Sequence, residues 1–498
     1  MENTTKETLA MLKGSLANGT QELAKTVTTG TGLVAYDLQA PAKNLYPQIT
    51  PLRNAIPRVS RAGNAGTATN WKQVTSLVGS GYNAMGWTPE GQRSGRMSYV
   101  TANKSAAYVK IGEEDSITVE AMAAAQGFED ENAKLTFRLL QKMMQKEEYA
   151  LLGGNQSLSL ATPSAPTLSA SGSTATLPAL TYSVIVVALT LEGFGNSSLA
   201  NGVATQQTIT GADNKTFVLN GGSSNKSGAT TQAVTLGQTL FASTPSVNGA
   251  VGYAWYTGAA GAEKLEKITT INSATFSAPL LGTGQAATAV TANNSANANT
   301  AFDGLLTTAF NSGVSYLNAL ATGTAGTGST LTASGTGTVV EIDNMLRSMW
   351  DTSRISPTVI YVNSQELQNI KNKCLSNASA PLLHINQQTS DGKGFMMTAG
   401  GRTAYYFNPF QVDGGTMIPI RVHPNLPAGT ILAYAEQLPT WYQSNEVPNV
   451  AEVITRRDYY RMDWPQITEA MDYGVYSQEV LAVYAPFGVG IINNIANG

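Results

Sequence analysis

Cysteine and histidine are almost absent from this chain of 498 residues. It has one cysteine, Cys374, and two histidines, His384 and His423. One cysteine excludes an intrachain disulfide, and these three residues cannot build the four-ligand zinc sites that Cys and His form. A site made of carboxylates stays conceivable, but no spacing in the sequence indicates one. We therefore expect no metal site and no cofactor.

Charge is also scarce. Asp, Glu, Lys and Arg make up 13% of the residues, about half the ~25% of an average soluble protein. The net charge of -3 and the pI of about 5.6 argue against a free-standing nucleic-acid binder, which needs a basic face. So few charges do little to keep copies of the chain apart. We expect β-rich structure with many tight turns, or a subunit whose faces are covered by its neighbours.

Long hydrophobic runs are missing as well. No run approaches the ~18 apolar residues of a membrane span. The opening sequence, MENTTKETLAMLKGSLANGT, is polar and lacks the apolar core of a signal peptide. We therefore expect a chain that is made and folded in the cytosol and has no membrane partner.

The amino-terminal third is predicted to contain an arm, an extended loop and a long helix. Residues 1–42 form the arm, and residues 43–156 form a domain with the loop at 58–112. Strand-like alternation is clearest in SYVTANKSAAYVKIG. Between positions 43 and 110 there are nine basic residues and one acidic residue, so charge is segregated onto this segment.

The strongest helical pattern covers residues 129–152. Acidic residues precede it and two glycines follow it, as is typical of helix ends. Its predicted buried face consists of Ala133, Phe137, Leu140, Met144 and Leu151.

From residue 157 to 300 the composition changes to Ser, Thr, Ala, Gly and Asn, with few charges. Short strand-like segments separated by turn residues predict a β-sandwich. A disordered linker is the alternative, but YSVIVVALTL and YAWY contain too many β-branched and aromatic residues for one.

Mixed structure is expected from residue 301 to 450. FDGLLTTAFNSGVSYLNALAT (302–322) is predicted to be a helix, and VVEIDNMLRSMWDTSR is another. VIYV reads as a buried strand, followed by a helix with Ser364 as its N-cap. The second helix should bury Ile342, Met345, Leu346 and Met349. Strands are expected from residue 395 onward, including the closing segment 451–498.

Catalytic patterns are weak throughout. Cys374 lies ten residues before His384, but a Cys/His pair acts through spatial geometry that this spacing does not establish. The Gly-rich run GTAGTGSTLTASGTGT lacks the GxxxxGK[ST] pattern of a phosphate-binding loop. No spacing places two carboxylates in one cleft for acid/base catalysis, among Asp343, Asp351, Glu366, Asp458 and Asp463. We therefore predict no catalytic residues and no enzyme.

The order of these parts resembles the major capsid protein of tailed bacteriophages, which has the Hong-Kong-97-type fold. VIYVNSQELQNI, PIRVHPNLPAGTIL and LAVYAPFGVGIINNI look like sequences of that family. The resemblance implies an α+β fold with an arm (1–42), a peripheral domain (43–156 and 451–498) with its extended loop and spine helix, and an axial domain (301–450).

The segment 157–300 departs from that pattern and would be an insertion. NGAVGYAWYTG and KLEKITTINSATFS look like the strand pair of an immunoglobulin-like or fibronectin type III module. The resemblance implies that this all-β sandwich decorates the outer surface.

The implied function is a shell subunit that assembles with itself into hexamers and pentamers of an icosahedral head around double-stranded DNA. Portal and scaffolding proteins, and in some heads cement proteins, would be partners; the implied location is the virion, assembled in the host cytoplasm. No sequence-specific nucleic-acid site is expected.

Basic residues of the extended loop would pair with carboxylates of neighbours such as Glu147, Glu148, Asp458 and Asp463. The predicted intersubunit residues are Arg58, Arg61, Lys72, Arg93 and Arg96. The alternative for these residues is a solvated basic face.

Two other functions stay open. One is a secreted or surface adhesion protein that binds glycans or host cells through the sandwich, against which the polar amino terminus argues. The other is a glycosidase with β-sandwich appendages, which would need paired carboxylates in a cleft.

Overall fold

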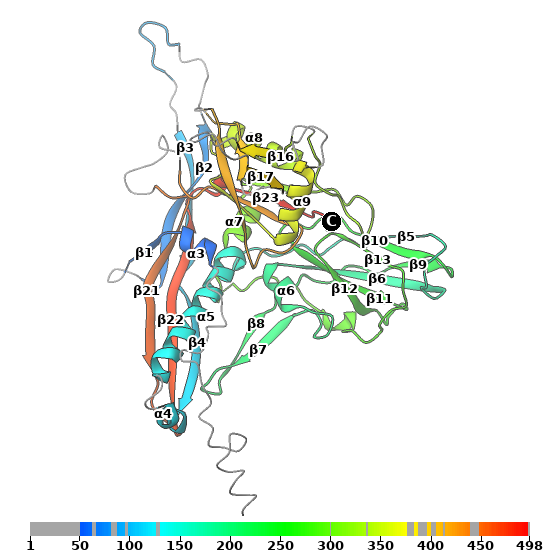
Figure 1. Cartoon of the computed structure of the whole chain (residues 1–498), viewed down its shortest axis with the longest axis horizontal. Coiled ribbons are helices and arrows are strands. Elements are labelled where there is room, and N and C mark those ends of the chain that lie inside the picture. The colour runs from blue at the N-terminus through cyan, green and yellow to red at the C-terminus, as the bar shows by residue number, and fades with distance from the viewer. Residues whose placement is uncertain are drawn as a thin grey trace, which may run out of the picture.

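A computed structural model describes most of the chain after residue 49. The described residues are 50–61, 66–80, 87–94, 98–125, 130–298, 300–334, 337–375, 383–386, 396–399, 405–411, 414–438 and 448–496. The expected arm (1–42) lies outside them. The described parts form a mixed α and β structure, in which a long sheet with a helix, a second sheet unit and a separate pair of sheets lie side by side (Figure 1).

The first layer is a four-stranded sheet with one long helix on it, which we call the plate (Figure 1). Its strand order is β1-β21-β22-β4, with bounds Arg58–Ser60, Ala451–Asp463, Ala470–Val483 and Val109–Thr118. The helix is α5, Glu131–Gly153, and the short helices α3 (Pro51–Ala55) and α4 (Val119–Ala125) lie nearby. The plate thus joins segments from both ends of the sequence.

Helix α5 covers nearly the range expected for it, but of its predicted buried face only Leu151 is fully buried. Asp130 caps the helix by accepting hydrogen bonds from the backbone of Asn132 and Ala133. Phe137, expected inside, is 50% exposed. Because the helix faces β4 and β22, its buried apolar residues Leu135, Leu139 and Met143 lie four positions apart, and the buried Glu147 and Leu151 continue this spacing. The prediction counted apolar residues only, whereas the buried face also contains charged ones.

A long hairpin extends from the plate. Its strands are β2 (Ala68–Ser80) and β3 (Ser98–Ala107), which pair antiparallel (Figure 1). In the middle of β2 the backbone N–H of Val74 donates to the carbonyl of Tyr484, at 2.7 Å. This hydrogen bond attaches the long hairpin to the residue that follows β22.

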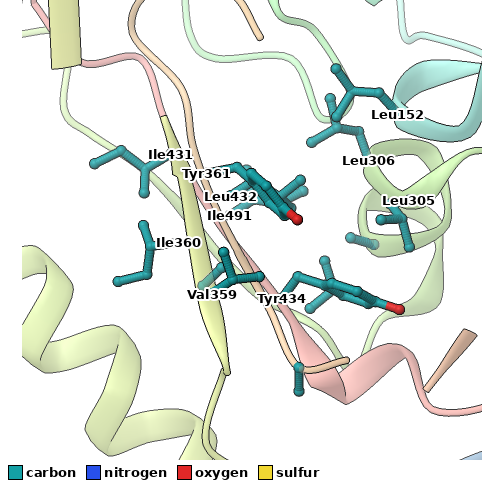
Figure 2. Close-up of a cluster of buried hydrophobic side chains, with 14 of the residues drawn as sticks. Leu152, Leu305, Leu306, Val359, Ile360, Tyr361, Ile431, Leu432, Tyr434 and Ile491 are labelled. Carbon is teal, nitrogen blue, oxygen red and sulfur yellow. The ribbon is translucent and has the colours of Figure 1, made fainter. Parts of the chain in front are cut away.

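The second unit is a six-stranded sheet with strand order β14-β23-β20-β15-β19-β18. The bounds are Tyr316–Ala319, Val489–Asn493, Ile431–Tyr434, Val359–Val362, Thr416–Val422 and Tyr405–Asn408. Helices α7 (Leu305–Ser312), α8 (Val340–Ser353) and α9 (Ser364–Leu375) accompany it. In Figure 2, Leu152 of α5 and Leu305 and Leu306 of α7 approach the apolar side chains of this sheet. The six-stranded unit and the plate therefore share one core.

Three small elements complete this region. Strands β16 (Leu383–Asn386) and β17 (Met396–Ala399) pair antiparallel, and the 3-10 turn η2 (Pro486–Gly488) precedes β23.

Two local predictions in this region need correction. The helix expected over 302–322 ends at Ser312, because Gly313 adopts a left-handed φ of 69°, and the chain continues as strand β14. The N-cap of α9 is Asn363 rather than Ser364, since the Asn363 side chain accepts the Gln365 N–H at 3.0 Å. The predicted buried face of α8 is confirmed.

The third part consists of two antiparallel sheets that share one core, and we call it the two-sheet unit (Figure 1). One sheet has the order β13-β10-β5, with bounds Ser273–Phe276, Thr239–Ser243 and Thr167–Ser171. The other has the order β12-β11-β6-β9, with bounds Lys264–Thr269, Gly252–Gly258, Leu180–Leu189 and Thr230–Val234. Leu240 and Trp255 are fully buried between the sheets.

Smaller elements complete the two-sheet unit: helix α6 (Leu191–Asn196), the 3-10 turn η1 (Ala287–Ala289) and a short hairpin of β7 (Gln206–Thr210) and β8 (Thr216–Asn220). The unit is attached to α5 by the Tyr149 hydroxyl, which donates to the carbonyl of Leu191 at 2.7 Å. Asn494 near the carboxyl end accepts the backbone N–H of Asn272 at 2.8 Å. Two separate chain segments therefore hold the two-sheet unit in place.

Within the described ranges, no helix combines the length and the apolar character that crossing a membrane requires.

Candidate functional site

A buried group of charged side chains lies where α5, the plate and the six-stranded unit meet. Glu147 and Glu148, two successive residues near the end of α5, both have fully buried side chains. Successive residues of a helix point about 100° apart, so the two carboxylates reach different elements. Ionised carboxylates are seldom fully buried unless they are paired, so their partners determine what this region does.

Glu147 faces the sheet of the plate. Arg53 donates through Nε to one oxygen at 3.2 Å, and Arg58 forms an ion pair with the other. The hydroxyl of Tyr459 on β21 also donates to Glu147, and its ring lies 4.7 Å from the Arg58 guanidinium carbon. Two arginines and one tyrosine therefore surround this carboxylate, and charge-assisted bonds of this kind are the stronger hydrogen bonds in proteins.

Arg58 is shared among several acids. Besides Glu147, its Nη2 lies 2.5 Å from Asp458 and 3.0 Å from Glu479 on β22. Burial raises the pKa of Glu479 to about 7, the charge of Glu147 adds to the rise, and Arg58 opposes it. One Glu479 oxygen, Oε1, is buried and has no hydrogen-bond partner among the described residues. Burial therefore favours the neutral form of Glu479.

Glu148 connects three elements. It accepts the backbone N–H groups of Leu52 and Arg53, the first turn of α3, at 2.9 and 2.7 Å. It also lies 2.6 Å from Nε2 of His423, which follows β19 and is fully buried. Because Nδ1 of His423 accepts the Asn425 N–H at 3.1 Å, Nε2 is the nitrogen that donates. One carboxylate thus fastens the plate to the six-stranded unit.

The basic residues predicted from the sequence separate into two groups. Arg58 lies inside the buried charged group and pairs with carboxylates of its own chain, among them the expected partners Glu147 and Asp458. Arg61, Lys72 and Arg93 are exposed. Arg96 lies outside the described residues.

The remaining expected acids also have partners in their own chain. Glu148 bonds to α3 and His423 as described, and Asp463 accepts from Nε of Arg461 at 2.7 Å. The buried group as a whole could not be assembled from sequence, because its members are up to about four hundred positions apart. The available signal was acidic residues inside apolar runs, in EEYALL and in SQEVLAV.

Among the candidate catalytic residues, those with described side chains have separate surroundings, and the side chain of His384 lies outside the described part. Cys374 is buried, and burial raises the pKa of its thiol. Asp343 accepts the hydroxyl of Tyr406 at 2.6 Å, and Glu366 accepts the N–H of Gly429 at 2.9 Å. In the part of the chain that the structure describes, no three His, Cys, Asp or Glu residues are placed to hold a metal ion.

Comparison with known proteins gave structural neighbours only. No family model and no curated protein matches the chain. Solved structures similar to it include the capsid of a native GTA particle, at TM-score 0.42 and 8% identity over 95% of this chain and 99% of that one. The SrpI encapsulin of Synechococcus elongatus PCC 7942 matches at TM-score 0.39 and 8% identity over 95% of each chain. The capsid of cyanophage P-SCSP1u matches at TM-score 0.37 and 10% identity over 95% of this chain and 97% of that one. These TM-scores are all below 0.5, so the proposal below is based on the geometry of the chain itself.

Proposed function

We propose that this chain is a shell subunit, the major capsid protein of a tailed bacteriophage with a Hong-Kong-97-type fold. In this proposal it assembles with itself into hexamers and pentamers of an icosahedral head that encloses double-stranded DNA. Its role is structural rather than catalytic, and its location is the virion, after synthesis and assembly in the host cytoplasm.

The observation that carries the proposal is the plate with its long hairpin. A helix of 23 residues, about 35 Å long, lies on a sheet whose two longest strands have 13 and 14 residues. The long hairpin reaches away from this plate (Figure 1). A surface this extended gains stability when copies of the chain cover it, as in a closed symmetric shell.

The exposed basic residues Arg61, Lys72 and Arg93 support contacts between copies. They belong to the segment in which basic residues greatly outnumber acidic ones, while the chain as a whole is slightly acidic. A neighbouring copy therefore offers them carboxylates. Arg58 is kept in the predicted set, but its pairing within its own chain already satisfies its charge.

The two-sheet unit supports the proposed immunoglobulin-like insertion. β5 and β10 pair in one sheet, while β6, which lies between them in sequence, pairs with β11 in the other. Such crossing between two packed antiparallel sheets is typical of Greek-key sandwiches. We propose that this unit decorates the outer surface of the head, with portal, scaffolding and cement proteins as further partners of the shell.

Mass photometry of the purified chain at rising concentration, followed by electron microscopy, tests the proposal. Rings of five and six, or closed shells, are expected. A chain that binds glycans or host cells as a stable monomer would instead favour the adhesion function.

A further inference from the structure

The end of the plate that lies away from the long hairpin carries a cluster of exposed apolar side chains. We call it the distal end, and it consists of residues 113–125 and 463–472. Ile467 is 90% exposed, and Val119, Trp464 and Met471 are each more than a third exposed. The short helix of this end, α4, has no buried residue. Single exposed apolar residues are common on protein surfaces, but a cluster of four indicates a contact site.

Hydrogen bonds hold the two segments of the distal end together. The backbone N–H of Val119 donates to the carbonyl of Glu469 at 3.0 Å, and that of Trp464 donates to the carbonyl of Asp472 at 3.1 Å. Strands β4 and β22 also pair along this end of the sheet. The exposed apolar residues therefore belong to one connected part of the plate.

The distal end is acidic. Residues 113–120 and 463–472 include seven acidic residues and no basic residue. Some of these acids pair with basic residues of their own chain. Asp115, Glu120 and Glu469 are exposed and form no ion pair with any residue that the structure describes. An acidic surface repels the phosphates of nucleic acid and favours a basic partner.

The long hairpin of the same chain has the complementary composition. The segment 58–112 contains seven basic residues and one acidic residue. Residues 87–94, which we call the hairpin connection, lie between β2 and β3 and include the exposed Arg93. Trp87 is 91% exposed, so Trp87 and Ile467 are the two most exposed large apolar side chains among the described residues. Tryptophan and arginine are enriched among the residues that dominate binding free energy at interfaces.

The two complementary surfaces lie at opposite ends of one chain. Strand β3 ends at Ala107 and β4 begins at Val109, so the long hairpin leaves the plate beside Val109. Strand β4 then runs for ten residues, about 33 Å, to Thr118 at the distal end. Figure 1 shows the long hairpin and α4 at opposite ends of the plate. The long hairpin therefore fits the distal end of a second copy rather than its own.

We propose that the hairpin connection of one copy docks on the distal end of a second copy. Trp87 packs beside Ile467, and Arg93 pairs with the exposed carboxylates there. The contact joins two different surfaces, so it is heterologous, and contacts of this type generate rings when the rotation between copies closes. The inference rests on the proposed shell and names the surface that receives the basic hairpin.

Cross-linking of two variants in assembled particles tests this contact. Thr88→Cys and Thr468→Cys, each in a Cys374→Ser background, place a thiol at exposed positions beside the two apolar anchors. Particles assembled from equal amounts of both variants, treated with a short bis-maleimide, should give linked dimers that particles of either variant alone do not give. The matched control mixes Thr88→Cys with Leu236→Cys, which is 78% exposed in the two-sheet unit, and should give few linked dimers.

Charge reversal provides a second measurement, made by mass photometry. Arg93→Glu should raise the concentration needed for assembly about fivefold, because it replaces an attraction by a repulsion. Glu120→Lys with Glu469→Lys in the same chain should lower that concentration again. The control is Asp213→Lys with Asp351→Lys, which makes the same change in net charge at exposed positions elsewhere and should not lower it.

Each measurement can overturn the contact. Intact particles in which cross-linking to Thr468→Cys does not exceed the control would overturn it and leave the proposed shell standing. Equal recovery by the two pairs of lysine substitutions would do the same, since it would attribute the effect of Arg93→Glu to net charge. Failure of the unaltered chain to form particles would overturn the proposed shell, and this contact with it.

Discussion

At the residue scale, the main feature is the sharing of one guanidinium among three carboxylates. Arg58 contacts Glu147, Asp458 and Glu479, and the first and last of these are fully buried. Removing an ion from water costs free energy that is recovered only if each charge is well paired. Glu479 has one oxygen without a partner, so its pairing recovers only part of that free energy, which agrees with its raised pKa.

The raised pKa of Glu479 predicts a dependence of stability on pH. Its pKa is about 7 in the folded chain and 4.5 in the unfolded chain, so the folded state binds the proton more tightly. Its contribution is therefore complete below the unfolded pKa and is lost as pH rises from 4.5 to about 7. Glu479→Gln should reduce the fall in unfolding free energy between about pH 5 and about pH 8 by roughly 2 kcal/mol, measured by denaturant unfolding of unassembled chain.

Two comparisons make this test specific. Asp458→Asn removes the exposed partner of the same guanidinium but keeps Glu479. The slope of unfolding free energy against pH that Glu479 causes should therefore persist in this variant. Burial also raises the pKa of Glu192 to about 7, so part of the total slope should remain in Glu479→Gln. An unchanged slope in Glu479→Gln would mean that Glu479 is already ionised in the folded chain over that range.

Glu148 predicts a large loss of stability on truncation. Glu148→Ala leaves the N–H groups of Leu52 and Arg53 and Nε2 of His423 without their acceptor. Breaking a buried pair by removing one partner costs about 3–5 kcal/mol. Urea unfolding of the unassembled chain should show a loss of this size, and Glu148→Gln should lose less because it keeps one acceptor oxygen.

Asp351→Ala is the matched control for an ion pair that is not buried. Asp351 pairs with Arg354 at 3.8 Å, and both side chains are more than half exposed. Its removal should cost about 0–1 kcal/mol. If Glu148→Ala cost no more than Asp351→Ala, the connection between the plate and the six-stranded unit would not depend on this carboxylate.

At the element scale, the spacing of apolar residues along the sequence predicted where helices lie better than it predicted which face of each helix is buried. The α8 face followed from its apolar spacing because that helix buries only small polar and apolar residues. The α5 face did not, because Glu147 and Glu148 occupy buried positions that an apolar count excludes. Charged residues enter a core only with partners from other segments, and one sequence does not show which segments meet.

Strand β14 shows a second limit of local patterns. YLNA has the apolar content of a continuing helix, yet it pairs in parallel with β23 near the carboxyl end of the chain. The glycine before it marks the end of α7, since a left-handed φ favours glycine. Long-range pairing of this kind overrides a short helical pattern.

The exposed basic residues of the segment 58–112 carry a prediction about assembly. Replacing Arg61, Lys72 and Arg93 together by Gln should leave a folded, soluble chain that assembles less well. Exposed ion pairs contribute about 0–1 kcal/mol each, so losing three per copy should raise the concentration needed for assembly about tenfold. Mass photometry measures this concentration directly.

A control with the same change in net charge replaces Arg138, Arg347 and Lys371, which are exposed and lie on helices α5, α8 and α9. Normal assembly is expected for it. Equal weakening in both variants would attribute the effect to net charge rather than to Arg61, Lys72 and Arg93.

At the scale of the whole molecule, the plate and the six-stranded unit share one hydrophobic core, and specific hydrogen bonds add to the connections between the parts. Glu148 links the plate to the six-stranded unit, and Tyr149, the next residue, links α5 to the two-sheet unit. The carboxyl end of α5 is thus the common junction of all three parts. The order of these parts along the chain could be predicted from composition and periodicity, whereas this junction could not.

The same junction bears on the proposed shell. In that proposal, connection of the three units at one point would set the angle between the plate and the six-stranded unit, and closure of copies into a symmetric shell depends on such angles.

Cryo-electron microscopy of particles assembled from the purified chain tests the central claim most directly. The account predicts closed icosahedral shells of pentamers and hexamers, in which the long hairpin of each copy contacts a neighbour and the two-sheet unit projects outward. Open filaments, or a chain that stays monomeric at every concentration, would contradict it.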